Sequence, residues 1–317
     1  MKKSIFIWAI AIILGATNCA ATHVSNSVVI GNEAAAGVRI KGSGVIISKI
    51  ESISNNYSSI RASRGVKVIM TDTESKVTKI EADDNVMPYV RVYVKDGVLN
   101  VHIDNEVKTI SNCTVRVTVP ANNRISSINA VSAAEVSIQT SLSCGELEIN
   151  GSSAGEVNFT KPFKADELSL NATSAAEIKF TKAQAKELDV ETSSAAEING
   201  TFNVEECDLS ATSAAKIDIE LLAVDCYAEA SSAAIIKLSG ECATMEAEAS
   251  SGATINAKEF CVHNHAEADA SSGGDIRVKV AKSLDASASS GGEIKYIPVN
   301  NSIKLVKKTS SGGSVGL

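Results

Sequence analysis

A short motif recurs about every 20 residues, and this repeat constrains the fold more than any other feature of the chain. It reads Ser-Ala-Ala-Glu-Ile in residues 174–178 and drifts to Ser-Gly-Gly-Glu-Ile in residues 290–294. Its central serines are Ser132, Ser153, Ser174, Ser194, Ser213, Ser232, Ser251, Ser272, Ser290 and Ser311. Such a fixed period is typical of solenoids, in which each repeat is one structural unit stacked on its neighbours.

Apolar residues alternate with polar residues on both sides of the motif. Leu168-Ser-Leu170 precedes Ser174, and Ile178-Lys-Phe180 follows it. A period of two predicts strands rather than helices. Each repeat is therefore predicted to form one coil of a parallel β-helix: a strand, a tight bend at Ser-Ala-Ala or Ser-Gly-Gly, a second strand and a polar turn. About ten such coils are expected, and each is stabilised by the coils above and below it.

The residue types at fixed positions of the repeat predict a thin core. The second position after each serine holds only Ala or Gly, and the fourth holds only Val or Ile. Because a buried hydroxyl needs a partner, we expect the serine hydroxyls to form a ladder along the stack or to bond an amide of the bend. Structural roles are therefore assigned to Ser153, Ser174, Ser194, Ser213, Ser232, Ser251, Ser272 and Ser290.

Residues 1–21 have the features of a signal peptide. Lys2 and Lys3 precede the apolar run of residues 5–14, and Cys19-Ala20-Ala21 offers small residues for cleavage after Ala21. An alternative is acylation of Cys19, but Asn18 stands where a lipoprotein signal has a small residue. Loss of the two lysines changes the formal net charge from −7 to −9, which argues against nucleic acid as a partner. We expect export to the periplasm or to the outer surface.

Residues 22–130 carry strands of irregular length. Residues 89–94 and 98–103 alternate around Lys95-Asp96-Gly97, which is a hairpin signal. We predict that this region is the irregular start of the same solenoid, and a sheet that caps its first end is the alternative. Because residues 120–125 lead into the repeat without a linker, the regular coils of residues 131–317 are expected to continue the same elongated domain.

Several segments occur in an order that resembles a known family. Arg64-Gly-Val-Lys-Val, residues 80–88, residues 90–101 and Val115-Arg-Val-Thr-Val-Pro precede coils of the Ser-Ser-Ala-Gly-Glu-Val type. This set resembles the head GIN domain family of putative auto-transporter adhesins over residues 40–317. The resemblance implies a right-handed parallel β-helix and an exported protein of a diderm bacterium. It supplies no catalytic motif.

The position three residues after the serine is rich in carboxylates. Glu135, Glu156, Glu177 and Glu197 are predicted to stack on the outer surface at about 4.8 Å. Because like charges in register repel, a hard divalent cation such as calcium would stabilise this arrangement. The alternative is a solvated acidic edge that is screened by salt. No cofactor is predicted, and calcium is the candidate ion for this column.

The segment Cys261-Val-His263-Asn-His265 has the only spacing that is typical of metal ligands. In an extended strand, Cys261, His263 and His265 would point to the same side, and thiolate with imidazole suits zinc. No fourth ligand is evident, so a polar turn with unrelated side chains is the alternative.

Six cysteines follow the signal segment, which raises the question of disulfides. Cys207 and Cys226 are expected in one inward column on adjacent coils, where they form either a disulfide or two buried thiols. Cys144 and Cys242 share another inward column but lie five coils apart, so they cannot pair.

These features favour a non-catalytic exported protein that acts as an adhesin or as a surface protein binding glycans or host or envelope proteins. The short turns leave little room for a catalytic pocket. A polysaccharide-processing enzyme, with a cleft near Asp83, Asp84 and Arg91, is the first alternative. The second is a scaffold that self-associates through its last coil, at Gly316-Leu317.

Overall fold

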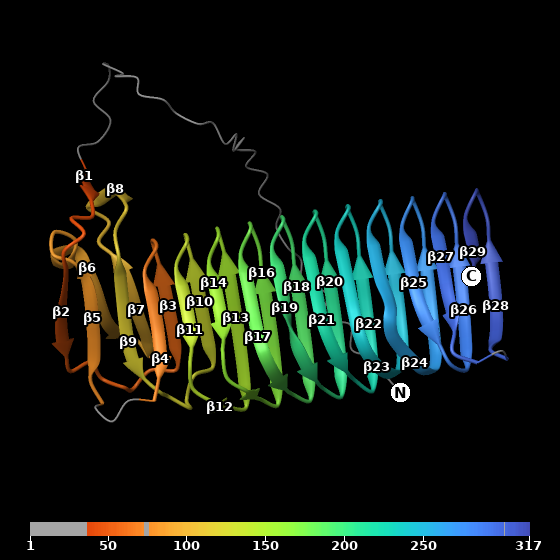
Figure 1. Cartoon of the computed structure of the whole chain (residues 1–317), viewed down its shortest axis with the longest axis horizontal. Helices are drawn as coiled ribbons and strands as arrows, with labels where there is room; N and C mark the ends of the chain where they lie inside the picture. The colour runs from red at the N-terminus through yellow and green to blue at the C-terminus, as the bar shows by residue number, and fades with distance from the viewer. Residues whose placement is uncertain (1–36, 73–75, 301) are drawn as a thin grey trace, which may run out of the picture. The chain divides into compact units, whose positions relative to one another are not determined.

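The computed structural model describes residues 37–72, 76–300 and 302–317. The predicted signal peptide, its cleavage after Ala21 and the acylation of Cys19 lie outside these residues. The repeats form a parallel β-solenoid, as predicted, and each coil contributes one strand to each of two parallel rows (Figure 1).

The first strand of each coil, which precedes the bend, lies in a row called here the first face. It consists of β3 (Ser59–Ser63), β10 (Ser127–Val131), β13 (Glu146–Ser152), β16 (Glu167–Ala172), β18 (Glu187–Thr192), β20 (Glu206–Ala211), β22 (Asp225–Ala230), the later parts of β23 (Ile235–Ala249) and β24 (Thr254–Ala270), β26 (Ser283–Ala288) and β28 (Lys304–Thr309).

The second strand of each coil, which follows the bend, lies in the second face. This row consists of β4 (Lys67–Thr71), β11 (Glu135–Ile138), β14 (Glu156–Phe159), β17 (Glu177–Gln184), β19 (Glu197–Asn203), β21 (Lys216–Leu222), the first parts of β23 and β24, β25 (Asp275–Val280), β27 (Glu293–Pro298) and β29 (Ser314–Gly316). Two short strands, β12 (Leu142–Ser143) and β15 (Phe163–Lys164), lie in the turns that lead to the next coil.

The bend between the faces has a left-handed backbone at two successive residues. Ser174 has a φ of 54° and Ala175 a φ of 60°, and most coils repeat this pair. The amide of Ala175 donates to the carbonyl oxygen of Ser194 on the next coil at 3.0 Å. The prediction that the serine hydroxyls form a ladder is wrong. The left-handed backbone turns the serine side chains to the surface, and backbone groups form the ladder instead.

The small and β-branched positions fill the core as predicted. Ala176 and Ile178 are buried, and so are their equivalents on the other coils except the last, where Gly313 and Val315 are half-buried. A short stack of aromatic rings adds to this core, because Phe159 lies parallel to Phe180 at 4.3 Å between ring centroids, and Phe180 contacts Phe202 at 5.5 Å. In-register stacking thus repeats each buried contact along the solenoid.

The N-terminal strands complete one end of the solenoid. They are β1 (Val38–Lys41), β2 (Ile46–Glu51), β5 (Thr78–Asp83), β6 (Val90–Lys95), β7 (Val98–Ile103), β8 (Val107–Ser111) and β9 (Val115–Pro120), with a 3-10 turn at Met87–Tyr89. The hairpin prediction is confirmed, because β6 and β7 pair antiparallel around Asp96 and Gly97, which both have positive φ.

The order of coils differs from the order of the sequence at this end. β3 and β4 pair with β10 and β11 on one side and with β7 and β9 on the other. Beyond β9 the sheet continues antiparallel through β5 to β2. The N-terminal region therefore contains both wide parallel coils and an antiparallel sheet.

Candidate functional site

Two rows of carboxylates run along the outside of the first face. Alternate residues of a strand point to the same side, and in-register coils align equal positions about 4.8 Å apart. The corner row consists of Glu146, Glu167, Glu187, Glu206 and Asp225. The face row, two residues further along each strand, includes Glu148, Asp189, Asp208, Glu246 and Glu267.

A groove of about 930 Å³ lies between these rows, and we call it the acidic groove. Its floor is the row of buried residues that separates them, such as Leu168, Leu188 and Cys207. All ten carboxylates of the two rows line the groove, and neither lysine nor arginine is among the lining residues. Within the described part of the chain, none of these ten carboxylates forms an ion pair.

The electrostatics of the acidic groove favour positive charge. Partial desolvation raises the pKa of Asp189 and of Asp208, although both side chains still contact solvent. Neighbouring carboxylates raise the pKa of Asp208 further. Burial, and then nearby carboxylates, also raise the pKa of the Tyr227 phenol, which stands in the face row. A ligand with positive charge or with hydrogen-bond donors would relieve this repulsion.

The carboxylates that the sequence analysis singled out lie on the second face. Glu135, Glu156, Glu177 and Glu197 stack in register as predicted. Lysines of the protein itself already neutralise much of this column, which we call the Glu column. Its ends are closed by Lys67, at 2.5 Å from Glu135, and by Lys216, at 2.7 Å from Glu197.

Lys179 pairs with Glu177 inside the Glu column, at 2.6 Å. Three of its four carboxylates therefore have a cation of the chain beside them, and the hydrogen bond from Lys216 lowers the pKa of Glu197. The repulsion that motivated the calcium prediction is smaller here than in the acidic groove. Calcium binding by the Glu column stays a prediction.

The histidines of the metal-like segment turn toward different coils. A bulge follows Val262, because Val262 pairs with Cys242 whereas His265 pairs with Thr244. The Nε2 of His263 lies 2.9 Å from Glu241 on the preceding coil, and the Nδ1 of His265 lies 2.9 Å from the Ser283 hydroxyl on the following coil. In the described residues, no three His, Cys, Asp or Glu side chains lie where they could hold a metal ion. The extended-strand geometry assumed for Cys261, His263 and His265 is thus wrong at the bulge.

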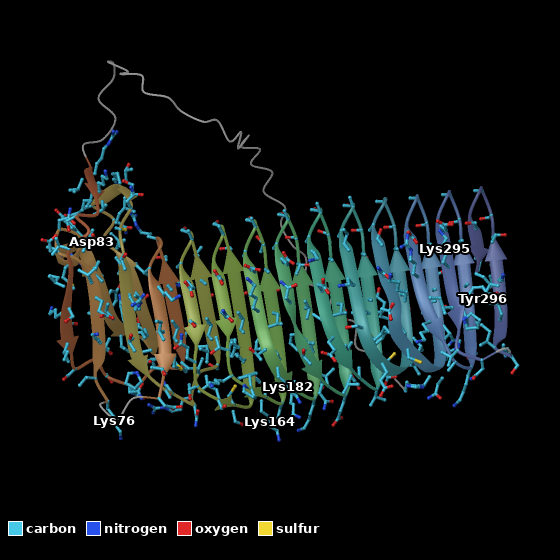
Figure 2. All side chains as sticks on the ribbon, viewed as in Figure 1. Lys76, Asp83, Lys164, Lys182, Lys295 and Tyr296 are labelled. Atoms are coloured by element: carbon cyan, nitrogen blue, oxygen red, sulfur yellow. The ribbon has the colours of Figure 1, made fainter. Side chains whose placement is uncertain are left out.

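Asp83 is buried and hydrogen-bonded to the backbone, whereas a catalytic carboxylate is expected to be exposed in a cleft. It is almost fully buried near the N-terminal end of the solenoid, where Figure 2 labels it. Its oxygens accept from the amides of Thr114, at 2.7 Å, and Gly44, at 2.6 Å, and these bonds lower its pKa. The carboxylate therefore joins the segments at Gly44 and Thr114 to the end of β5.

The two other residues of the suggested enzyme cleft are also engaged in local contacts. Asp84 accepts from the Ser43 hydroxyl at 2.5 Å. Arg91 pairs with Asp104 at 2.8 Å and donates to the carbonyl oxygen of Pro88. Neither residue lines the acidic groove.

The expected cysteine columns are present. Cys207 and Cys226 are directly opposite each other on β20 and β22, and both are buried free thiols in this structure. The hydrogen bond with Cys207 and the burial of the site both raise the pKa of Cys226. Cys226 therefore remains protonated near neutral pH, where a thiol is a poor nucleophile.

The acidic groove itself was missed by the sequence analysis. The runs Leu188-Asp-Val190 and Cys207-Asp-Leu209 alternate in the same way as Leu168-Ser-Leu170, and the middle residue of each is an aspartate of the face row. The middle residues of successive runs form the face row. The acidic residues directly before many of the same runs form the corner row. The signal was therefore available in the sequence.

Comparison with known proteins agrees with this architecture. The family model described as putative auto-transporter adhesin, head GIN domain, matches residues 56–201 and 179–298. The chain belongs to this family. No curated protein matches the sequence. The family description names adhesion and no catalysed reaction, and it indicates an exported or surface protein.

Solved structures share the fold at low sequence identity. A putative adhesin from Parabacteroides merdae aligns with a TM-score of 0.53 and 17% identity, covering 88% of this chain and 98% of its own. A putative lipid binding protein from Parabacteroides distasonis aligns with a TM-score of 0.54 and 18% identity over the same shares. These likenesses concern the fold alone. In the part of the chain that the structure describes, no helix is long and apolar enough to cross a membrane.

Proposed function

We propose that this protein is a non-catalytic, adhesin-like binding protein of the bacterial envelope and that the acidic groove is its ligand-binding surface. The groove is the observation that carries this proposal, because ten carboxylates line about 930 Å³ and neither lysine nor arginine is among its lining residues. The family description and the solved putative adhesin support the general role.

The charge of the groove suggests the kind of ligand. Two parallel rows of carboxylates suit a partner that presents repeated amino groups, such as a basic segment of a host or envelope protein. Neutral glycans could also donate hydroxyl hydrogen bonds to the carboxylates, whereas anionic glycans would be repelled. Binding through the groove should weaken steeply as the salt concentration rises.

The test is a binding screen of the purified protein against matrix proteins and neutral, cationic and anionic glycans, with and without calcium. We expect specific binding to a basic or neutral ligand, and loss of that binding when Glu187, Asp189 and Asp208 are changed to their amides. Exclusive binding of anionic glycans, or a hit that survives these substitutions, would refute the assignment of the groove.

A polysaccharide-processing enzyme is the second candidate. Its active site would lie in the acidic groove and not near Asp83, Asp84 and Arg91. Asp189 and Asp208 have raised pKa values and lie side by side, as paired carboxylates do in glycoside hydrolases. Turnover of a polysaccharide that disappears in both Asp189→Asn and Asp208→Asn would favour this candidate. Turnover that persists in both variants, or none with any substrate of the screen, would count against it.

A further inference from the structure

Strand β2, at the N-terminal end of the solenoid, exposes an unusual amount of apolar surface. Val45, which directly precedes the strand, is 57% exposed, and Ile46, Ile47 and Ile50 are 48%, 42% and 68% exposed. They lie within residues 45–50, and the other two residues of this segment, Ser48 and Lys49, are exposed as well. An exposed apolar strand of this kind is a surface on which another strand pairs.

One edge of β2 is free within the described residues. β2 pairs antiparallel with β5, and no other described strand pairs with it (Figure 1). The carbonyl oxygen of Val45 accepts from the amide of Asp84, at 2.9 Å, so the backbone groups of Val45 point toward β5. Backbone groups alternate in direction along an antiparallel strand. Those of Ile46, Ser48 and Ile50 therefore point to the free edge.

These three residues form a self-complementary set. If two β2 strands pair antiparallel about a two-fold axis at Ser48, Ile46 of each copy stands opposite Ile50 of the other, and Ser48 stands opposite Ser48. All three free-edge residues of each copy then stand in hydrogen-bonded pairs. The three pairs form two backbone hydrogen bonds each, which makes six. A shift of two residues in either direction leaves one of the three unpaired.

We propose that two copies of this chain associate through their β2 strands in this register. The same register brings Ile46 and Ile50 together twice on one side of the new sheet, and cross-strand pairs of β-branched residues stabilise it. Lys49 and Glu51 lie on the other side and already pair with each other, so no unpaired charge is buried there. The contact is isologous and closes as a dimer.

A contact of one strand pair is small, so the dimer should dissociate in the micromolar range rather than the nanomolar range. The test is sedimentation equilibrium of the purified protein across this range, for the natural sequence and for Ser48→Pro. Proline removes an amide that points to the free edge, and leaves the bonds between β2 and β5 intact. We expect the dissociation constant to rise at least about tenfold, as for the loss of two symmetry-related hydrogen bonds.

Ser48→Ala is the matched control, because it keeps the backbone amide and should leave the dissociation constant within about twofold. Val306→Lys tests the alternative contact through the last coil, where Val306 is 40% exposed, and it should leave the dimer intact. Circular dichroism of each variant should match that of the natural sequence. A dimer that Val306→Lys abolishes and Ser48→Pro does not would overturn the proposal.

Cross-linking tests the register independently of affinity. Residues in a hydrogen-bonded antiparallel pair have Cα atoms about 5.5 Å apart, which suits a disulfide. Ser48→Cys should therefore cross-link two copies on mild oxidation, whereas Ile46→Cys should not exceed the background of the natural cysteines. A protein that sediments as a monomer at every concentration would refute the proposal.

Discussion

The bend at Gly291 and Gly292 allows a stability prediction that separates two adjacent glycines. A Cβ added to Gly292 would lie 2.3 Å from the carbonyl oxygen of Ala270 and 2.5 Å from its carbonyl carbon, where ordinary contact begins at 3.4 Å. Both obstructing atoms belong to the backbone of the neighbouring coil. The difference between the 2.3 Å contact and ordinary contact at 3.4 Å is about 1 Å, so the two coils must move apart by about this distance to remove the clash.

Such a displacement would break bonds of the backbone ladder. The amide of Ser289 donates to Ala270 at 2.9 Å and that of Glu293 to Gly274 at 2.8 Å, and neither bond survives lengthening by about 1 Å. Two lost hydrogen bonds at about 1 kcal/mol each, together with residual overpacking, give a loss of about 2–4 kcal/mol for Gly292→Ala.

Gly291→Ala is the matched control. Gly291 has a φ of 77°, and an added Cβ meets nothing within 4 Å. Ala175 occupies the equivalent bend position at a φ of 60°. An alanine in the left-handed conformation costs about 1–2 kcal/mol relative to glycine. The substitution also reduces the conformational entropy of the unfolded chain, which offsets about half of that cost. We therefore expect a net loss of stability below about 1 kcal/mol.

Urea unfolding measures the difference, and hydrogen exchange of the β26 and β27 amides reports it locally, because long repeat arrays can lose two-state behaviour. Gly292→Ala should lower the urea midpoint and expose these amides, whereas Gly291→Ala should do neither to a comparable extent. Equal effects of the two substitutions, or a neutral Gly292→Ala, would refute the reasoning from backbone contact.

Three further predictions concern the core and the charges. Phe180→Ala should lower the free energy of unfolding by about 3–5 kcal/mol in urea, because Phe180 is buried against Phe159; a loss below about 1 kcal/mol would contradict the aromatic stack. Lys216→Ala should cost at most about 1 kcal/mol, since its pair with Glu197 is exposed, and high salt should remove the difference. A folded carboxylate with a raised pKa binds protons more tightly than in the unfolded chain, so stability should rise as the pH falls from 7 through that pKa, and thermal melts of Asp208→Asn should show a smaller rise.

The solenoid could be predicted because its signals are local and repeated. Ser174 marks a bend and Ile178 an inward position, and each recurs at the same place in successive coils. The position of β3 between β7 and β10, and of β4 between β9 and β11, could not be predicted in this way. It depends on pairing between strands that are distant in the sequence, and no periodicity reports that pairing.

The candidate site was predicted less well than the fold, for two physical reasons. Carboxylates were expected to matter where they repeat next to the serine, but ion pairs with Lys67 and Lys216 neutralise that column, and such pairs depend on contacts between coils. The hydroxyl ladder failed because side-chain direction follows the left-handed φ of Ser174, which composition alone does not show.

The most direct test of the proposed function compares the two acidic surfaces of one protein in one binding screen. The first variant carries Glu187→Gln, Asp189→Asn and Asp208→Asn in the acidic groove, and the control carries Glu156→Gln and Glu177→Gln in the Glu column. We predict that a ligand bound by the natural sequence is retained by the control and lost by the groove variant. Retention by both variants, or loss in the control alone, would contradict the assignment of the acidic groove as the binding surface.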